Sequence, residues 1–181
     1  MISETINQMN ILSRLKSIKT FVFDMDGVLT DGSILVDAAG NWLRRMHTRD
    51  GYALQLAIKA GYKIVIISGS ESAPVAERLN KLGITDVFMK VLNKEKFLEE
   101  YILKNNYKTS EILCMGDDIP DYAFMTMAGF ACCPADAAFE IKKISSYISP
   151  LNGGEGCVRD VIEKVLKLNN HWPLDTSVAA T

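Results

Sequence analysis

The stretch "FVFDMDGVLTDG", from Phe21 to Gly32, decides the fold. Its first three residues are apolar and predict a buried strand, and the strand is followed by Asp24, Asp26 and Gly27. Carboxylates at the end of a buried strand are costly unless a cation, a ligand or a reaction makes use of them. Residues i and i+2 leave a strand on the same face, so we expect the two carboxylates to serve one site.

Short apolar runs alternate with amphipathic segments along the rest of the chain. The predicted strands are Thr20–Phe23, Lys63–Ile67, Val87–Met89, Ile112–Met115 and Phe130–Cys133. The predicted helices are Tyr52–Ala60, Pro74–Leu82, Glu95–Asn105, Tyr122–Met127 and Val158–Leu168. Strands that are apolar on both faces are typical of a parallel sheet covered on both sides. The alternation therefore predicts an α/β fold, a three-layer Rossmann-like parallel sheet.

One segment, residues 33–46, breaks this alternation. "SILV" and "NWLRRM" flank "DAAG", which predicts a β-hairpin with Gly40 in its turn. Arg44 and Arg45 are interpreted as polar residues that face solvent. The other hairpin side chains are too apolar for a two-stranded ribbon standing in water, so we expect other subunits to bury them.

Length and charge limit the possible classes of protein. The 181 residues predict one domain, with an N-terminal extension over 1–19, the domain over 20–170 and a loose tail over 171–181. The net charge is -2 and no basic cluster stands out, which argues against nucleic-acid binding. No long apolar run predicts a membrane span or a secretory signal. The four cysteines contain no C-x-x-C pair, which argues against zinc, and we expect a cytoplasmic protein.

Polar residues follow two further predicted strands where each strand ends. "SGS" occupies residues 68–70, and "GDDIPD" supplies Asp117, Asp118 and Asp121. The carboxyl ends of parallel strands meet at one edge of a sheet, so these groups should gather with Asp24 and Asp26. Clustered carboxylates without histidine or cysteine favour a hard cation such as Mg²⁺.

The same edge carries groups suited to phosphate. Ser68 offers a hydroxyl and Gly69 a free backbone N–H at a strand-to-helix turn. Lys94 and Lys96 are both candidates for a lysine that contacts phosphate. One carboxylate of the Asp24–Asp26 pair can then attack phosphorus, and the other can act as general acid and base.

In this order, "DMDGVLTDG", "SGS", Lys94 and "GDDIPD" resemble the motifs of the haloacid dehalogenase superfamily of phosphohydrolases. "TRDGYALQLAIKAGYKIVIISG" and "GGEGCVRDVIEKVL" extend the resemblance to its small capless branch, which contains 3-deoxy-D-manno-octulosonate 8-phosphate (KDO 8-phosphate) phosphatase. The resemblance covers roughly residues 20–168. It implies a HAD-like fold with a projecting hairpin and no cap domain.

The resemblance also implies roles for individual residues. Asp24 matches the nucleophile and Asp26 the acid/base, while Lys94 rather than Lys96 matches the family lysine. The implied Mg²⁺ ligands are Asp24, the backbone carbonyl of Asp26, and Asp117. Ser68 and Gly69 match the phosphate-binding positions, Asp121 the residue that orients Lys94, and Asp118 a supporting or helix-capping residue. The positions expected to contact the sugar are Asp26, Thr48, Arg49, Asp50, Gly51, Ser70 and Arg78.

The substrate implied by the branch is KDO 8-phosphate, which places the enzyme in lipopolysaccharide precursor synthesis. The branch also implies a homotetramer whose hairpins help to wall neighbouring sites. Two alternatives stay open: a phosphatase of a nine-carbon sugar acid 9-phosphate, and a receiver-like phospho-Asp signalling domain. Ser70 stands where the family often has arginine, which leaves the sugar specificity open. The glycines of "NGGEG", residues 152–156, predict a mobile flap.

Overall fold

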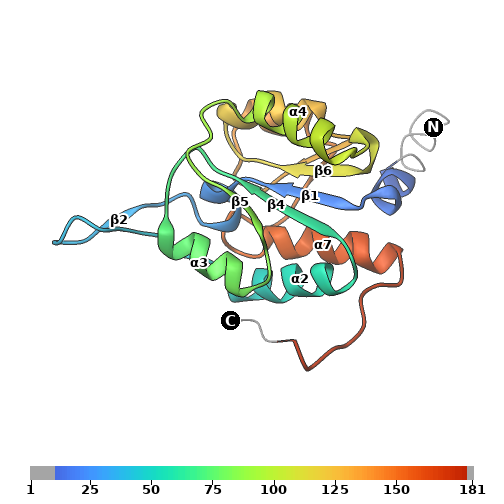
Figure 1. Cartoon of the computed structure of the whole chain (residues 1–181), viewed down its shortest axis with the longest axis horizontal. Helices are drawn as coiled ribbons and strands as arrows, with labels where there is room; N and C mark the ends of the chain where they lie inside the picture. Colours follow the sequence, from blue (N-terminus) through green and yellow to red (C-terminus); the bar gives the residue numbers. More distant parts are fainter. Residues whose placement is uncertain (1–10, 179–181) are drawn as a thin grey trace.

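The computed structural model describes residues 11–178, and a parallel six-stranded sheet forms the centre of this part of the chain. The strands are β1 (Thr20–Phe23), β4 (Lys63–Ile67), β5 (Asp86–Phe88), β6 (Ile112–Met115), β7 (Phe130–Cys133) and β8 (Tyr147–Ile148). Their order is β5-β4-β1-β6-β7-β8, so β1 pairs with β4 on one side and β6 on the other (Figure 1). The carboxyl end of β1 therefore opens near the middle of the sheet edge.

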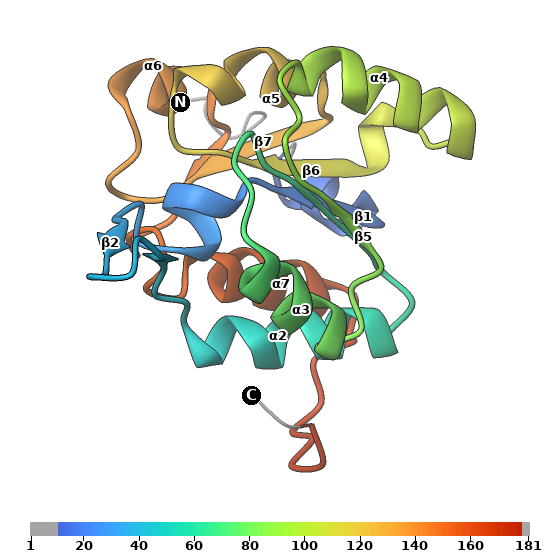
Figure 2. The ribbon, with the colours of Figure 1, turned by 60° about the vertical axis from the view of Figure 1, so that its left-hand side comes forward.

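Helices cover both faces of the sheet, which gives the three layers that the sequence predicts (Figure 2). One layer contains α2 (Thr48–Lys59), α3 (Ala73–Lys81) and α7 (Cys157–Leu168). The other contains α4 (Lys94–Asn105), α5 (Tyr122–Met127) and α6 (Phe139–Ile144). Short helical turns, η1 (Met25–Leu29), η2 (Thr109–Glu111) and η3 (Ile119–Asp121), lie between the regular elements.

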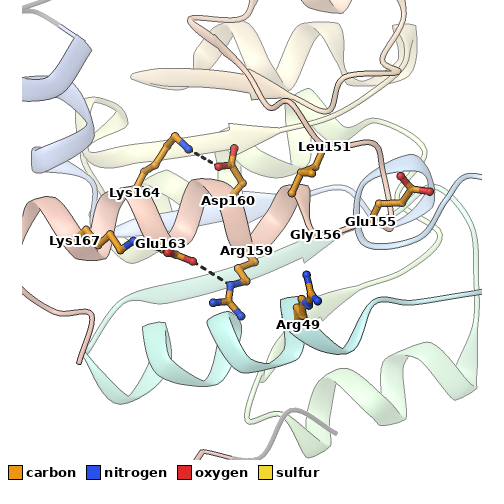
Figure 3. A pocket seen from close by; sticks show the side chains of 9 residues that line it. All are labelled: Arg49, Leu151, Glu155, Gly156, Arg159, Asp160, Glu163, Lys164 and Lys167. Carbon is orange, nitrogen blue, oxygen red and sulfur yellow. Dashed lines mark hydrogen bonds and ion pairs between the residues drawn. The ribbon is translucent and has the colours of Figure 1, made fainter. Parts of the chain in front are cut away.

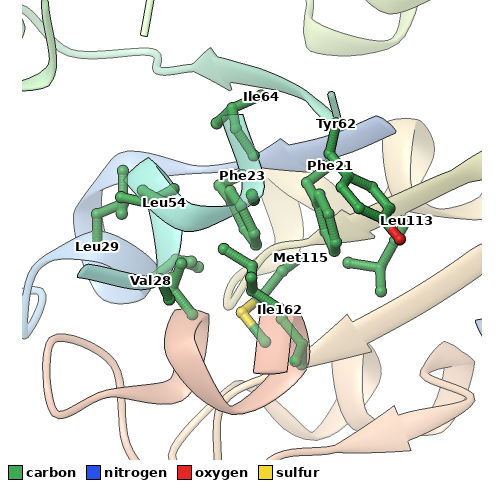
Figure 4. Packing of buried hydrophobic residues seen from close by; sticks show 14 of the residues in the cluster. Phe21, Phe23, Val28, Leu29, Leu54, Tyr62, Ile64, Leu113, Met115 and Ile162 are labelled. Atoms are coloured by element: carbon green, nitrogen blue, oxygen red, sulfur yellow. The ribbon is translucent and has the colours of Figure 1, made fainter. Parts of the chain in front are cut away.

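Successive side chains of β1 enter two separate cores. Phe21 and Phe23 stack with their ring centroids 5.9 Å apart and pack with Leu54 of α2 and Ile162 of α7 (Figure 4). Val22, which points the other way, packs in the second core on the α4 side. The strand is apolar on both faces because both faces are buried, and this double burial fixes the position of Asp24 directly after it.

The hairpin forms a second, two-stranded antiparallel sheet of β2 (Leu35–Val36) and β3 (Trp42–Leu43). It projects from the body of the molecule (Figure 1) and is closed at its base by a bridge between Thr30 and Met46. The β2 and β3 residues are exposed, Trp42 by 61%. The predicted hairpin is thus confirmed, with an apolar surface that nothing in the chain covers over residues 11–178.

The predicted elements are all present with small shifts, while the helical residues 11–17 and two short elements were not predicted. The helix α2 begins at Thr48 instead of Tyr52, because the His47 ring nitrogen Nδ1 accepts a hydrogen bond from the Arg49 N–H and caps the helix. The strand β5 begins and ends one residue earlier than predicted. The sequence did not predict α6 and β8, which are too short to show a hydrophobic period.

Both ends of the described chain contact the domain. Residues 11–17 are helical, and Leu15 and Ile18 are buried in the core. After α7, Trp172 meets the Tyr52 ring edge-on, and the Tyr52 hydroxyl donates to the Asp175 carbonyl at 3.1 Å. None of the helices within residues 11–178 has the length and apolar character needed to cross a membrane.

Candidate active site

A cavity of about 320 Å³ opens at the carboxyl edge of the sheet. Its lining gathers residues from the turns after β1, β4 and β6 and from the start of α4. They are Asp24, Asp26, Gly32, Ser68, Gly69, Ser70, Lys94, Asp117, Asp118, Pro120 and Asp121. The structure therefore brings together the carboxylates, the "SGS" turn and the lysine that the sequence places at strand ends.

Lys94 lies at the bottom of this cavity between two buried carboxylates. Its Nζ is 2.6 Å from Asp24 Oδ1 and 2.6 Å from Asp121 Oδ1. The other Asp121 oxygen, Oδ2, accepts from the Asp117 N–H at 3.0 Å. Asp121 and Asp24 thus contact the same ammonium group from two sides. Lys96, the other candidate, lies on the solvent side of α4 near Glu100.

The acidic cluster has more negative charge than its lysine can balance. Oxygens of Asp24, Asp117 and Asp121 lie within 4.8 Å of one another. Burial, followed by repulsion from Asp121, raises the pKa of Asp24 to about 7. Burial and repulsion from Asp24 raise the pKa of Asp117 to about 8. A hard divalent cation with oxygen ligands fits this donor set. Both oxygens of Asp121 are engaged, Oδ1 by Lys94 and Oδ2 by the Asp117 N–H, whereas Lys94 contacts only Oδ1 of Asp24.

Asp26 sits at the mouth of the cavity in a different environment. Its Oδ1 accepts from Arg44 Nε at 2.7 Å, and its Oδ2 accepts from the Ser70 hydroxyl at 2.6 Å. Burial alone would raise the pKa of Asp26, but the hydrogen bonds from Arg44 and Ser70 outweigh it and lower that pKa. The pKa values of two carboxylates that are two residues apart are thus shifted in opposite directions by their different surroundings.

Arg44 corrects one reading of the sequence. It was interpreted as a solvent-facing hairpin residue, yet only 1% of its side chain is exposed, and its guanidinium reaches back from the hairpin into the site. The neighbouring Arg45 is the residue that faces solvent, with 69% of its side chain exposed. No local pattern in the sequence distinguishes Arg44 from Arg45, because the difference arises from the tertiary contact with Asp26.

The turn after β4 brings Ser68, Gly69 and Ser70 to the cavity. Ser68 is buried, and its hydroxyl accepts from the Ser70 N–H at 3.1 Å. The Ser68 N–H is engaged with the Phe88 carbonyl of β5 at 2.9 Å, which fixes the loop to the sheet. Ser68 and Gly69 line the cavity together with Lys94 and the carboxylates.

Known proteins resemble this chain in sequence and in fold. The family model of haloacid dehalogenase-like hydrolases matches residues 79–162. The 3-deoxy-D-manno-octulosonate 8-phosphate phosphatase of Yersinia pestis is 28% identical over 157 residues, which cover 87% of this chain and 84% of that protein. The crystal structure of the phosphatase of the same name from Moraxella catarrhalis, in complex with magnesium, phosphate and KDO, is 33% identical. It has a TM-score of 0.86 and covers 89% of this chain and 93% of that one.

This chain belongs to the haloacid dehalogenase-like hydrolases. The reaction class of the enzyme is the hydrolysis of phosphoric monoesters. A hydrolase of subfamily III A from Legionella pneumophila has a TM-score of 0.89 at 28% identity and covers 94% of this chain and 93% of that one. This HAD-like hydrolase has no cap domain. Between Asp26 and Ser68 it holds only the turn η1, the hairpin, α2 and the sheet strand β4, and between Ser68 and Lys94 only α3 and β5.

The structure explains why residue 27, directly after the Asp24–Asp26 pair, is glycine. Its φ of 84° is in the left-handed region, which favours glycine. A Cβ at this position would also collide with the Asp117 carboxylate. The glycine therefore allows the turn after the Asp24–Asp26 pair and lets Asp117 approach the pair from β6.

We expect Gly27→Ala to displace Asp117 and to lower kcat on the order of 100-fold, the scale of a misplacement of about 1 Å at a catalytic site. The apparent affinity for Mg²⁺, measured from the metal dependence of turnover, should fall as well. Gly40→Ala is a matched control, because Gly40 also has a positive φ of 82° but has nothing within 4 Å of the added methyl. Equal effects of the two substitutions would show that backbone strain, not the collision, is responsible.

The "NGGEG" segment is not a free flap in the structure, contrary to the prediction. Gly153 and Gly154 are buried, and the Gly154 N–H donates to the Val28 carbonyl at 3.0 Å. A Cβ on either glycine would collide with backbone of the turn between Gly27 and Asp31. The segment is glycine-rich because it packs backbone to backbone under the catalytic turn.

Most residues expected to contact the sugar lie outside the catalytic cavity of a single chain. Thr48, Arg49, Asp50 and Gly51 form the first turn of α2, and Arg78 lies on α3 near Met46. Arg49 lines a separate cavity of about 480 Å³ beside α7, together with Arg159 and Glu163 (Figure 3). Ser70 and Asp26 are the members of the expected set that line the catalytic cavity.

Asp50 and Asp118 have structural partners in the chain. Asp50 is buried and accepts from the Arg159 N–H at the start of α7 at 2.7 Å, and burial raises its pKa to about 6. It therefore ties α2 to α7. Asp118 caps η3 by accepting from the Ile119 N–H at 2.8 Å, which matches the capping role considered for it.

Proposed function

We propose that this protein is a Mg²⁺-dependent phosphatase of KDO 8-phosphate that works through an aspartyl-phosphate. The observation that carries the proposal is the position of Asp24, which is buried, is held by Lys94 and lines one small cavity with Ser68 and Gly69. The similarity to the KDO 8-phosphate phosphatases supports the choice of substrate.

The proposed reaction has two steps. Asp24 attacks phosphorus and the bond from phosphorus to the sugar oxygen breaks. Arg44 and Ser70 favour Asp26 as a carboxylate in the free site, so Asp26 first takes up a proton from solvent and then gives it to that oxygen. A water molecule then attacks the phosphorus, its proton passes to Asp26, and the bond to Asp24 breaks. Lys94, Ser68 and the Gly69 N–H hold the phosphate oxygens. Mg²⁺, held by Asp24, Asp117 and the Asp26 carbonyl, supplies the positive charge that lets two anions meet.

The function is tested by phosphate release from a panel of substrates. The panel contains KDO 8-phosphate, a nine-carbon sugar acid 9-phosphate and p-nitrophenyl phosphate. We expect repeated turnover and the highest kcat/KM for KDO 8-phosphate. A preference for the nine-carbon ester would favour the alternative phosphatase, and Ser70 in place of arginine makes this comparison necessary. Retention of one phosphate per chain without turnover would favour a receiver-like domain, although receivers carry the phosphorylated Asp after their third strand and Asp24 follows the first.

We propose a homotetramer assembled through the hairpin as the working form. The hairpin exposes Leu35, Val36, Trp42 and Leu43, and an apolar surface of this kind marks an interaction site. The cavity has no lid of its own, while phosphoryl transfer benefits from the exclusion of water. A neighbour's hairpin supplies such a lid, and assembly would bring Arg49 and Arg78 of adjacent chains toward the substrate carboxylate. The four unpaired, buried cysteines support a reducing compartment such as the cytoplasm.

Replacing both Trp42 and Leu43 by glutamate should break this assembly. The kcat/KM for the sugar-acid phosphate should fall about tenfold more than that for p-nitrophenyl phosphate, which corresponds to ~1.4 kcal/mol of lost binding in the transition state. Sedimentation and kinetics on the same variant provide the measurement. Leu103→Glu, which alters an exposed leucine of α4, is the control. A monomeric variant with unchanged selectivity would show that specificity does not depend on assembly.

A further inference from the structure

The guanidinium of Arg44 is bound to both oxygens of the Asp26 carboxylate. Its Nε lies 2.7 Å from Oδ1 and its Nη2 3.2 Å from Oδ2. The two N–H groups of an arginine fork match the two oxygens of a carboxylate, so a pair of this kind fixes the plane of the carboxylate as well as its place. The Arg44 side chain is almost fully buried although it belongs to a projecting hairpin.

The remaining contacts complete the frame around Asp26. The Ser70 hydroxyl donates to Oδ2 at 2.6 Å, and the Thr30 hydroxyl donates to Oδ1 at 3.3 Å. Arg44 Nη2 also lies 3.2 Å from the Ser70 hydroxyl, so the guanidinium occupies the space beside the short side chain of residue 70. A long side chain at position 70 would compete for this space. The short serine at position 70 therefore leaves the space that the Arg44 guanidinium occupies.

We propose that Arg44, which reaches Asp26 from the hairpin, is the positioning residue for the acid/base Asp26. The inference rests on the proposed function, since it assigns a role in the step that Asp26 performs. A general acid acts only within hydrogen-bond reach of the leaving oxygen, so the orientation of its carboxyl group controls its efficiency. Arg44 also connects this orientation to the hairpin, because the base of the hairpin is fixed at Thr30 and Met46.

Substrates with different leaving groups distinguish a positioning role of Arg44 from a merely structural one. A sugar alkoxide needs a proton as it departs, whereas p-nitrophenolate is a stable anion near neutral pH and departs without one. We expect Arg44→Ala to lower kcat/KM for an alkyl phosphate such as the sugar-acid ester about 10- to 100-fold, less than the 10²–10⁴-fold expected for loss of the acid itself. The kcat/KM for p-nitrophenyl phosphate, which reports the first step only, should stay within about threefold.

Three further variants sharpen the experiment. Arg44→Lys keeps the charge but not the fork, so it should recover only part of the lost activity. Arg45→Ala is the matched control, because the adjacent arginine is exposed and contacts Asp31 and Glu155 instead of the cavity. In an Asp26→Asn background, Arg44→Ala should produce no further loss, since a residue that acts through Asp26 has nothing left to position.

Two results would overturn the assignment. Equal losses on the alkyl and p-nitrophenyl esters would show that Arg44 only stabilises the site, and a full additional loss in the Asp26→Asn background would show that it acts independently of Asp26. Thermal unfolding of each variant verifies that it is folded. Failure of the proposed function is distinguishable, because the unaltered protein would then turn over none of the esters.

Discussion

Asp24→Asn should abolish phosphatase turnover and leave the protein folded. An amide has no anionic oxygen to attack phosphorus, so we expect a loss on the order of 10⁴-fold or more, as for other enzymes deprived of their nucleophile. The substitution should not weaken the fold, because it removes one of three carboxylates that crowd each other around Lys94. The thermal midpoint of the metal-free variant should therefore equal or exceed that of the unaltered protein.

The covalent step allows a second test of this prediction, by detection of the phosphorylated protein. The unaltered protein, quenched during turnover, should carry one phosphoryl group on Asp24 that is detectable by mass, and Asp24→Asn should carry none. Asp26→Asn should also lose activity, by about 10²–10⁴-fold, the usual contribution of a general acid/base. Asp37→Asn in the exposed hairpin turn is the matched control. Substantial turnover by Asp24→Asn would rule out the aspartyl-phosphate.

The sheet could be predicted from sequence because its strands obey a single physical rule. Buried parallel strands must be apolar on both faces, and runs such as "TFVF" and "KIVII" show this directly. The parallel arrangement then fixes which strand ends meet, so Asp24, Ser68 and Asp117 could be placed in one cavity without knowledge of any side-chain contact. The elements that were missed, α6 and β8, contain too few residues for a hydrophobic period.

The contacts of long side chains could not be predicted from the sequence. Arg44 has the pattern of an exposed hairpin residue, and only the tertiary structure shows that the hairpin folds its guanidinium back onto Asp26. Asp50 lies in the "TRDG" stretch that resembles a substrate-binding segment, yet in the chain it accepts from the Arg159 backbone. Both interactions join residues that are far apart in the sequence, and neither leaves a local pattern.

Removal of divalent cations should abolish activity, and Mg²⁺ should restore it. Three carboxylates, Asp24, Asp117 and Asp121, share one ammonium group, that of Lys94, and the incoming phosphate adds further negative charge to the same cavity. Without a cation the approach of substrate is opposed by repulsion that Lys94 alone does not balance. Turnover after treatment with EDTA, before and after addition of MgCl₂, measures the effect. Full activity in the chelator would contradict the proposed cofactor.

The pKa values of the same carboxylates make the metal effect depend on pH. Burial raises the pKa of Asp24 to about 7 and that of Asp117 to about 8, above their ordinary value of 3.8, so the folded metal-free protein holds protons that the unfolded chain releases. The stability that this contributes is fully present below the ordinary value and is lost as the pH rises through the raised values. A cation replaces these protons, because its ligands must be deprotonated.

The rise in thermal midpoint caused by MgCl₂ should therefore be larger at about pH 8.5 than at about pH 6. Asp117→Asn should remove most of this difference between the two pH values. A midpoint shift that is the same at both pH values would place the cation away from these carboxylates. A shift that Asp117→Asn leaves unchanged would lead to the same conclusion.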